Sequence, residues 1–138
     1  MKRDLIVVTQ RDYNRLTKVL SEESRHSAGN AINLRKLADE LHRARKVAPE
    51  NVPSTVVTMN SEIEFIDLDS NTTRKIKLVY PRNADIRKGQ ISVTTPVGTA
   101  ILGYEKGDVI EWEVPAGKKR FLIRDILYQP EANGDYMD

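Results

Sequence analysis

The segment 95–103 constrains the fold more than any other part of the chain. Pro96 has the fixed φ and the missing backbone donor that suit the first turn of a helix. Three apolar residues behind it recur at spacings of three and four, which places them on one helical face: Val97, Ala100 and Ile101. Gly103 stands where a helix ends in the left-handed conformation. The segment therefore predicts a short helix over 97–102 with one buried face.

The residues that follow predict a β-hairpin. Apolar and acidic residues alternate over 109–114, the pattern of a half-buried strand. Pro115-Ala116-Gly117 is a turn signal, and a returning strand is expected over 118–128. The apolar phase of that strand slips between Ile123 and Ile126, so we expect a bulge at Arg124-Asp125. Four further strands are predicted over 55–60, 62–68, 74–80 and 91–94, with a turn at Asp69-Ser70-Asn71 between the second and the third of the six.

The first third of the chain predicts two helices. Thr9 is a candidate cap for a helix of about 15 residues that starts at Gln10, with Asp12 in its first turn. Asn30 is a candidate cap for a second helix of about 18 residues, which Pro49 stops. Its apolar residues repeat at three and four, which is typical of a coiled-coil seam: Leu34, Leu37, Leu41, Ala44 and Ala48.

Two helices joined by a short loop pack antiparallel, so residues 1–48 are expected to form a helical hairpin. At 1.5 Å per residue the hairpin would be roughly 22–27 Å long. The stretch 5–8 is expected to be a short strand or an anchor on the second domain, residues 49–138. The predicted fold class is α+β: a short antiparallel helical hairpin (coiled coil), followed by an antiparallel β domain with one short helix.

Composition excludes several kinds of site. The 138 residues contain no cysteine, which excludes disulfides, thiolate zinc sites and cysteine nucleophiles. No apolar run of membrane-spanning length and no signal peptide stands out, so we expect no membrane association and a cytoplasmic location. Residues 1–48 hold 11 basic and 6 acidic residues, a balance of +5, whereas residues 49–138 hold 11 and 14, a balance of −3. This asymmetry is ordinary surface variation, or it gives the two parts different surroundings.

Candidate functional residues in the hairpin are charged. Glu22 and Glu23 form an acidic pair near the turn, where two carboxylates can hold a hard cation if they converge. Adjacent helical residues point about 100° apart, and the nearby Arg25 and His26 would repel a cation, so a solvated helix end is the expected reading. His26 and His42 are isolated and are expected at the surface. A basic face is predicted on the second helix, as a solvated face or a phosphate contact: Arg35, Lys36, Arg43, Arg45 and Lys46.

The segment 95–103 also resembles a known family. Four pieces match in order: Thr95-Pro96-Val97-Gly98-Thr99-Ala100-Ile101-Leu102-Gly103, Gly107-Asp108, Pro115-Ala116-Gly117 and Ile126-Leu127-Tyr128. This ordered set is similar to the C-terminal domain of the bacterial Gre transcription factors. The segments 56–61 and 128–136 resemble its short Rnk-type members, named as regulators of nucleoside diphosphate kinase. The resemblance covers roughly residues 48–136.

The resemblance implies an FKBP-like fold and a partner. In Gre factors the matching turn docks on the rim of the secondary channel of RNA polymerase, so four residues become candidate polymerase contacts: Thr94, Thr95, Pro96 and Val97. We expect exposed hydroxyls beside a proline in this turn, which would form a rigid contact surface with little ordering cost. Four basic residues become candidate contacts of the channel wall, or of RNA or DNA in the transcription complex: Arg35, Lys36, Arg43 and Lys46.

The resemblance suggests three functions, and the length of the hairpin decides between the first two. Full Gre factors have a much longer coiled coil, whose acidic tip helps to hold magnesium for cleavage of backtracked RNA. We therefore expect a non-enzymatic regulator without a cofactor, acting as a monomer, that binds polymerase and competes with longer factors. The alternative is a cleavage factor that uses Glu22 and Glu23. A prolyl isomerase, suggested by the fold alone, lacks the expected aromatic pocket. The residues give no argument for direct contact with nucleoside diphosphate kinase.

Overall fold

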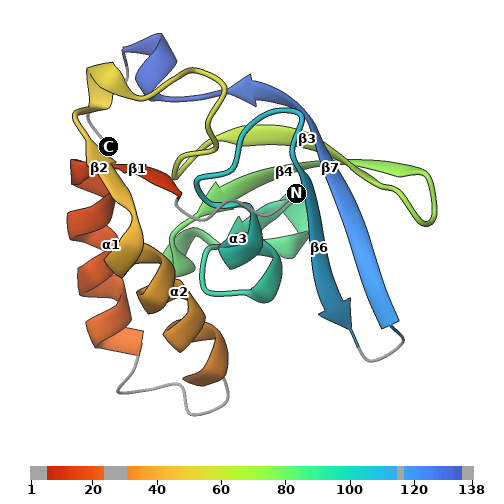
Figure 1. The fold of residues 1–138 in the computed structure, drawn as a ribbon, viewed down its shortest axis with the longest axis horizontal. Coiled ribbons are helices and arrows are strands. Elements are labelled where there is room, and N and C mark those ends of the chain that lie inside the picture. Colours follow the sequence, from red (N-terminus) through yellow and green to blue (C-terminus); the bar gives the residue numbers. More distant parts are fainter. Residues whose placement is uncertain (1–5, 24–30, 115–116, 135–138) are drawn as a thin grey trace.

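The computed structural model describes residues 6–23, 31–114 and 117–134. A pair of helices lies on one side of a five-stranded sheet, and a short third helix lies between this pair and the sheet (Figure 1). This arrangement confirms the α+β prediction. None of the helices in the described ranges is long and apolar enough to cross a membrane.

The N-terminal part consists of β1 (Val7–Thr9), α1 (Gln10–Glu23), α2 (Ala31–Arg43) and β2 (Arg45–Val47). The predicted cap of α1 is confirmed, because Thr9 Oγ1 accepts a hydrogen bond from the Asp12 backbone N–H at 3.0 Å. The stretch 5–8 is predicted to be a short strand or an anchor on the second domain, and its described residues do both. Val7 and Val8 belong to β1, and Ile6 is buried in the core.

The prediction that the second helix continues to Ala48 is wrong. The helix ends at Arg43, and Arg45–Val47 forms a two-stranded parallel sheet with β1. The Arg45 backbone N–H donates to the Ile6 carbonyl at 2.9 Å instead of to its own helix. The edge of β1 thus replaces the last turn of the predicted helix, while Ala44 of the predicted seam is still buried.

The main sheet has the strand order β5-β4-β3-β7-β6. Its strands are β3 (Glu62–Asp67), β4 (Thr72–Val79), β5 (Gln90–Ser92), β6 (Val109–Val114) and β7 (Gly117–Tyr128). Five of the six predicted strands are therefore present. All neighbours are antiparallel except β4 and β5, which pair in parallel, so the prediction of an antiparallel sheet is wrong for this one pair. Whether the sheet is FKBP-like stays a prediction.

Two local predictions about this sheet are confirmed. Glu64 pairs with Asp125 but the next residue, Phe65, pairs with Ile123, so Arg124 is the extra residue of a bulge. The turn between β3 and β4 forms where expected. Asp67 Oδ1 accepts the backbone N–H of Asp69 at 3.0 Å and that of Ser70 at 3.2 Å.

The predicted strand over 55–60 is absent. Turns occupy its two ends, at Thr55 and at Met59-Asn60, and Val56 makes an isolated bridge to Glu105. Asn60 has a φ of +67°, which interrupts an extended conformation. The Val57 N–H donates to the Tyr104 carbonyl at 2.8 Å, and the segment crosses the core as a buried connection.

The short helix α3 (Pro96–Ile101) is present, and it begins and ends one residue before the predicted range of 97–102. Gly98 lets it lie directly on β5, because a Cβ there would overlap the Ser92 carbonyl oxygen and lie 2.8 Å from Val93 Cα. Gly103 has a φ of +80°, and a Cβ there would overlap Ile6 Cβ. The two glycines therefore bring α3 against the sheet and the N-terminal segment against the end of α3.

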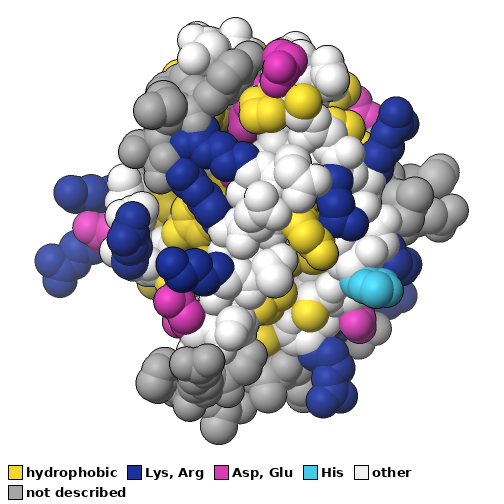
Figure 2. All heavy atoms as spheres, turned by 90° about the vertical axis from the view of Figure 1, so that its left-hand side faces the viewer, with side chains coloured by type: hydrophobic (Ala, Val, Ile, Leu, Met, Phe, Trp, Pro, Cys, Tyr) yellow, Lys and Arg dark blue, Asp and Glu magenta, His cyan; other side chains and the backbone are white. Residues whose placement is uncertain are grey.

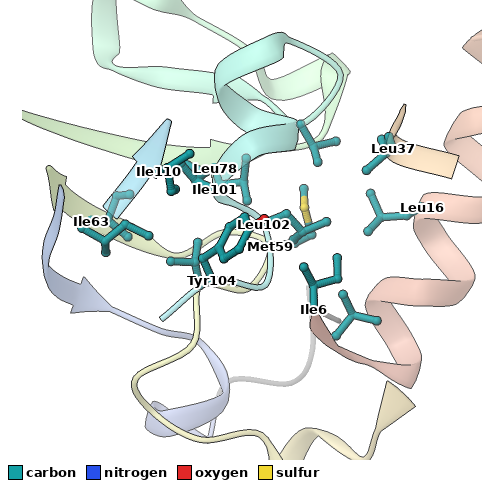
Figure 3. Packing of buried hydrophobic residues seen from close by; sticks show 14 of the residues in the cluster. Ile6, Leu16, Leu37, Met59, Ile63, Leu78, Ile101, Leu102, Tyr104 and Ile110 are labelled. Atoms are coloured by element: carbon teal, nitrogen blue, oxygen red, sulfur yellow. The ribbon is translucent and has the colours of Figure 1, made fainter. Parts of the chain in front are cut away.

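One cluster of buried apolar residues joins the helices to the sheet (Figure 3). Leu16 and Leu37 come from α1 and α2, Met59 lies between them and the sheet, and Ile63 and Ile123 come from β3 and β7. Leu16, Leu37, Ile63 and Ile123 are fully buried. The division after residue 48 into two domains stays a prediction, and the apolar cluster spans it.

Candidate functional site

The turn before α3 has its hydroxyl groups bonded within the chain. Thr94 is buried, and its Oγ1 lies 2.7 Å from Ser92 Oγ. Thr95 Oγ1 donates to the Ser92 carbonyl at 2.7 Å and accepts from the Gly98 N–H at 3.1 Å, as the N-cap of α3. The expectation of exposed hydroxyls is therefore wrong for Thr94, since this side chain supports the turn from inside.

The surface of this turn is apolar at its leading edge. Pro96 is exposed and Val97 is half-buried, packed against the core cluster. The cap and the core hold both residues in place, so this surface is rigid and would cost little to order on binding. Helix α3 also contacts α2, which brings this surface close to the hairpin.

The predicted basic residues of the hairpin lie at the surface. Arg35, Lys36, Arg43 and Lys46 are all exposed. Arg43 pairs with Glu40 at 3.4 Å, and Lys46 Nζ lies 4.4 Å from the centre of the Tyr13 ring. Figure 2 shows the hairpin side of the molecule, over which Lys and Arg side chains are spread with few acidic ones between them.

The hairpin tip is described only in part. Glu22 is exposed and Glu23 is half-buried at the end of α1. Arg25 and His26 lie outside the described residues, and His42 is exposed on α2. In the described ranges, no three His, Asp or Glu side chains form a group that could hold a metal ion.

A buried polar network around Asp12 is a feature that the sequence reasoning missed. Asp12 Oδ2 accepts the Met59 backbone N–H at 3.2 Å, and Asp12 Oδ1 accepts the Tyr80 hydroxyl at 3.3 Å. Thr58 Oγ1 donates to Glu131 Oε1 at 2.7 Å beside it. Asp12 therefore joins α1 to the connection that precedes β3 and to the residue that follows β4. Its spacing of four from Leu16 was the available signal, because it places Asp12 on the buried face.

Burial determines the ionisation of this network. The pKa of Asp12 is raised from 3.8 to about 6, first by burial and then by the charge of the nearby Glu131 carboxylate. Hydrogen bonds from Met59 and Tyr80 and the charge of Arg15 act in the opposite direction. Burial, and then the Asp12 charge, also raise the pKa of Tyr80 well above its usual value, which keeps its hydroxyl a donor.

Comparison with known proteins finds a family match for the N-terminal part of the chain and another for the C-terminal part. The family described as transcription elongation factor, GreA/GreB, C-terminal matches residues 52–128, and the family described as Rnk N-terminus matches residues 5–47. The regulator of nucleoside diphosphate kinase from Escherichia coli strain K12 is 38% identical over 141 residues, which cover 99% of each chain. The chain belongs to the Rnk branch of the GreA/GreB family. This confirms the resemblance seen in the sequence.

Two further relatives are a solved structure that this chain covers almost entirely and a GreA that is longer than this chain. A prokaryotic transcription elongation factor GreA/GreB of known structure, from Nitrosomonas europaea, has a TM-score of 0.75 and 38% identity, over 89% of this chain and 99% of its own. The transcription elongation factor GreA of Pelobacter propionicus is 35% identical over 96 residues. That match covers 70% of this chain and 61% of GreA. Family membership thus makes this chain similar to transcription regulators.

Proposed function

We propose that this Rnk-branch chain binds bacterial RNA polymerase at the rim of the secondary channel and regulates transcription without stimulating transcript cleavage. The observation that carries the proposal is a GreA/GreB-type C-terminal part joined to a short hairpin. The docking surface would be the turn of Thr94, Thr95, Pro96 and Val97, with Pro96 and Val97 meeting the partner and the two threonines holding them. Such a partner places the chain in the cytoplasm, where we propose that it acts as a monomer.

The length of the hairpin supports the absence of cleavage. Helices α1 and α2 have 14 and 13 residues, which at 1.5 Å per residue give about 21 and 20 Å. Gre factors reach the catalytic centre with a much longer coiled coil. A hairpin of this length would fill only the entrance of the channel, so it would exclude longer factors from the same place.

The basic residues of the hairpin add a second contact to this proposal. Arg35, Lys36, Arg43 and Lys46 would lie against an acidic channel wall, or against RNA or DNA in the transcription complex. Contacts of this kind weaken steeply as salt increases. The effect on nucleoside diphosphate kinase in the name of the Escherichia coli relative would then act through transcription.

A competition assay with core polymerase tests the docking. The wild-type chain should bind core polymerase and be displaced by a Gre factor. Pro96→Glu puts a charge on the exposed edge of the turn and should weaken binding about tenfold or more. Pro53→Glu, at another exposed proline, is the matched control and should change binding less than about twofold. Absence of binding, or equal losses in both variants, contradicts the proposal.

Backtracked elongation complexes separate the two functions. With magnesium present, the wild-type chain should leave the RNA length unchanged. Magnesium-dependent shortening that disappears in Glu22→Ala/Glu23→Ala would instead establish the cleavage alternative. Shortening that survives this double substitution would assign the activity to other residues and would also contradict our proposal.

A further inference from the structure

A polar hollow of about 430 Å³ lies beside β4, and none of the residues of the proposed docking turn lines it. The connection that follows β4 forms one of its walls, and this wall includes residues of the short 3₁₀ helix η3 (Pro81–Asn83). Its lining residues are mainly polar: Asn60, Lys77, Val79, Arg82, Asn83, Ala84, Asp85 and Gln90.

The walls of this hollow are fixed by the backbone. Asp85 and Gln90 exchange two backbone hydrogen bonds, of 2.8 and 2.9 Å. The Lys77 N–H donates to the Gly89 carbonyl at 2.8 Å. Gly89 has a φ of +73°, and a Cβ there would lie 3.0 Å from the Lys75 carbonyl oxygen. The backbone of the hollow is therefore fixed, and a ligand would have to order only side chains.

Its charges are not compensated within the described part of the chain. Lys77 is half-buried and Arg82 is exposed, and neither side chain makes an ion pair or hydrogen bond with a described residue. Glu62 stands opposite Lys77 in the β3–β4 register but forms no ion pair with it. Asp85 is the one acid of the lining. Its Oδ1 accepts the Arg87 N–H at 3.1 Å, which leaves Oδ2 available.

We propose that this hollow binds a phosphate ester of a small molecule that carries hydroxyl groups, such as a sugar phosphate or a nucleoside phosphate. Arg82 and Lys77 would bind the phosphate, the guanidinium by paired hydrogen bonds and the ammonium as a point charge. The amides of Asn60, Asn83 and Gln90 donate and accept, and Asp85 Oδ2 would accept from a hydroxyl.

The size and the lining of the hollow define this ligand class. Its volume lies within the range of small-molecule sites, roughly 300–1,000 Å³. None of its lining residues is aromatic, so stacking would not select a nucleobase. The proposal does not depend on polymerase binding, and each can fail without the other.

Isothermal titration calorimetry of the full chain tests this site. The probes are ribose 5-phosphate, adenosine 5′-diphosphate, inorganic phosphate and a single-stranded oligonucleotide. At least one ester should bind about tenfold more tightly than inorganic phosphate. Lys77→Gln/Arg82→Gln should weaken that binding about tenfold or more, since each charge-assisted hydrogen bond contributes on that scale.

The matched control removes two charges from the same connection outside the hollow. Arg87 and Lys88 are exposed and do not line it, so Arg87→Gln/Lys88→Gln should change the affinity less than about threefold. Circular dichroism verifies that both double variants fold. No ester binding at millimolar concentration, equal losses in both variants, or preference for inorganic phosphate would overturn the proposal. Tightest binding of the oligonucleotide would also overturn it, in favour of a nucleic-acid backbone.

Discussion

Replacing Asp12 by Asn removes a buried carboxylate that joins the first helix to the sheet. Asp12 is 6% exposed, and its oxygens accept from the Met59 N–H and the Tyr80 hydroxyl. Asn keeps the size of the side chain and one acceptor oxygen, while its amide group can donate to the Tyr80 oxygen. The substitution therefore tests the charge of Asp12 more than its packing.

The sign and the size of the effect follow from the raised pKa. Between pH 3.8 and about 6, the folded chain keeps a proton on Asp12 that the unfolded chain has lost. The stability that this group contributes is full below pH 3.8, decreases as the pH rises through that window, and is lost above about 6. At about 1.4 kcal/mol for each pH unit, the loss is about 3 kcal/mol.

The measurement is the free energy of unfolding in urea, for wild type and Asp12→Asn, from pH 4 to pH 8. The stability of the variant minus that of the wild type should increase by about 2 kcal/mol between pH 4 and pH 7 and then stay nearly constant, because part of the loss of about 3 kcal/mol has already occurred by pH 4. Asp39→Asn, at an exposed carboxylate of the same hairpin, controls for the loss of one negative charge. A difference that does not change with pH, or that decreases as pH rises, refutes the reasoning.

Three further substitutions test the packing, each read by urea unfolding against wild type. Gly98→Ala should cost at least about 2 kcal/mol, because its Cβ would overlap the Ser92 carbonyl; a neutral result means that α3 does not lie on β5. Gln129→Ala should cost about 2 kcal/mol, since its Nε2 donates to the Pro53 and Val56 carbonyls at 2.8 and 2.7 Å; a loss near zero contradicts those bonds. Leu37→Ala should cost about 2–5 kcal/mol, and less would place Leu37 outside the core.

Local signals explain which elements could be predicted from the sequence. The start of α1 depends on Thr9, and the start of α3 depends on Thr95 and Pro96, each within one turn of the element. The bulge at Arg124 appears as a slip in apolar phase along one strand. Such features depend on residues that are only a few positions apart, so they can be predicted from the sequence.

The sequence predictions of the end of α2 and of a strand over 55–60 are wrong because contacts with distant segments decide the local structure there. The end of α2 depends on Ile6, whose carbonyl accepts the N–H of Arg45 39 positions later. Residues 55–60 have the composition of a strand, yet they have no partner strand and one residue with positive φ. Tertiary competition of this kind leaves no local signal.

The candidate sites divide in the same way. The exposure of the basic hairpin residues and the turn at Pro96 could be predicted, because charges and turn residues are visible in sequence, but the burial of the Thr94 hydroxyl could not. The contacts of Asp12 could not, since Met59 and Tyr80 are 47 and 68 residues away. The hollow beside β4 likewise combines residues from 60 to 90, and no motif marks them.

The shared core limits what a short hairpin can do. Ile6 packs against Gly103 at the end of α3, Asp12 is bonded across to Met59, and α2 contacts α3. The hairpin is thus held on the same core that positions the proposed docking turn. In the described ranges β2 follows α2 directly and pairs with β1, so docking through that turn would leave the described part of the hairpin near the entrance of the channel. Within the family, cleavage would then require a longer hairpin with acids at its tip, whereas competition would require only docking.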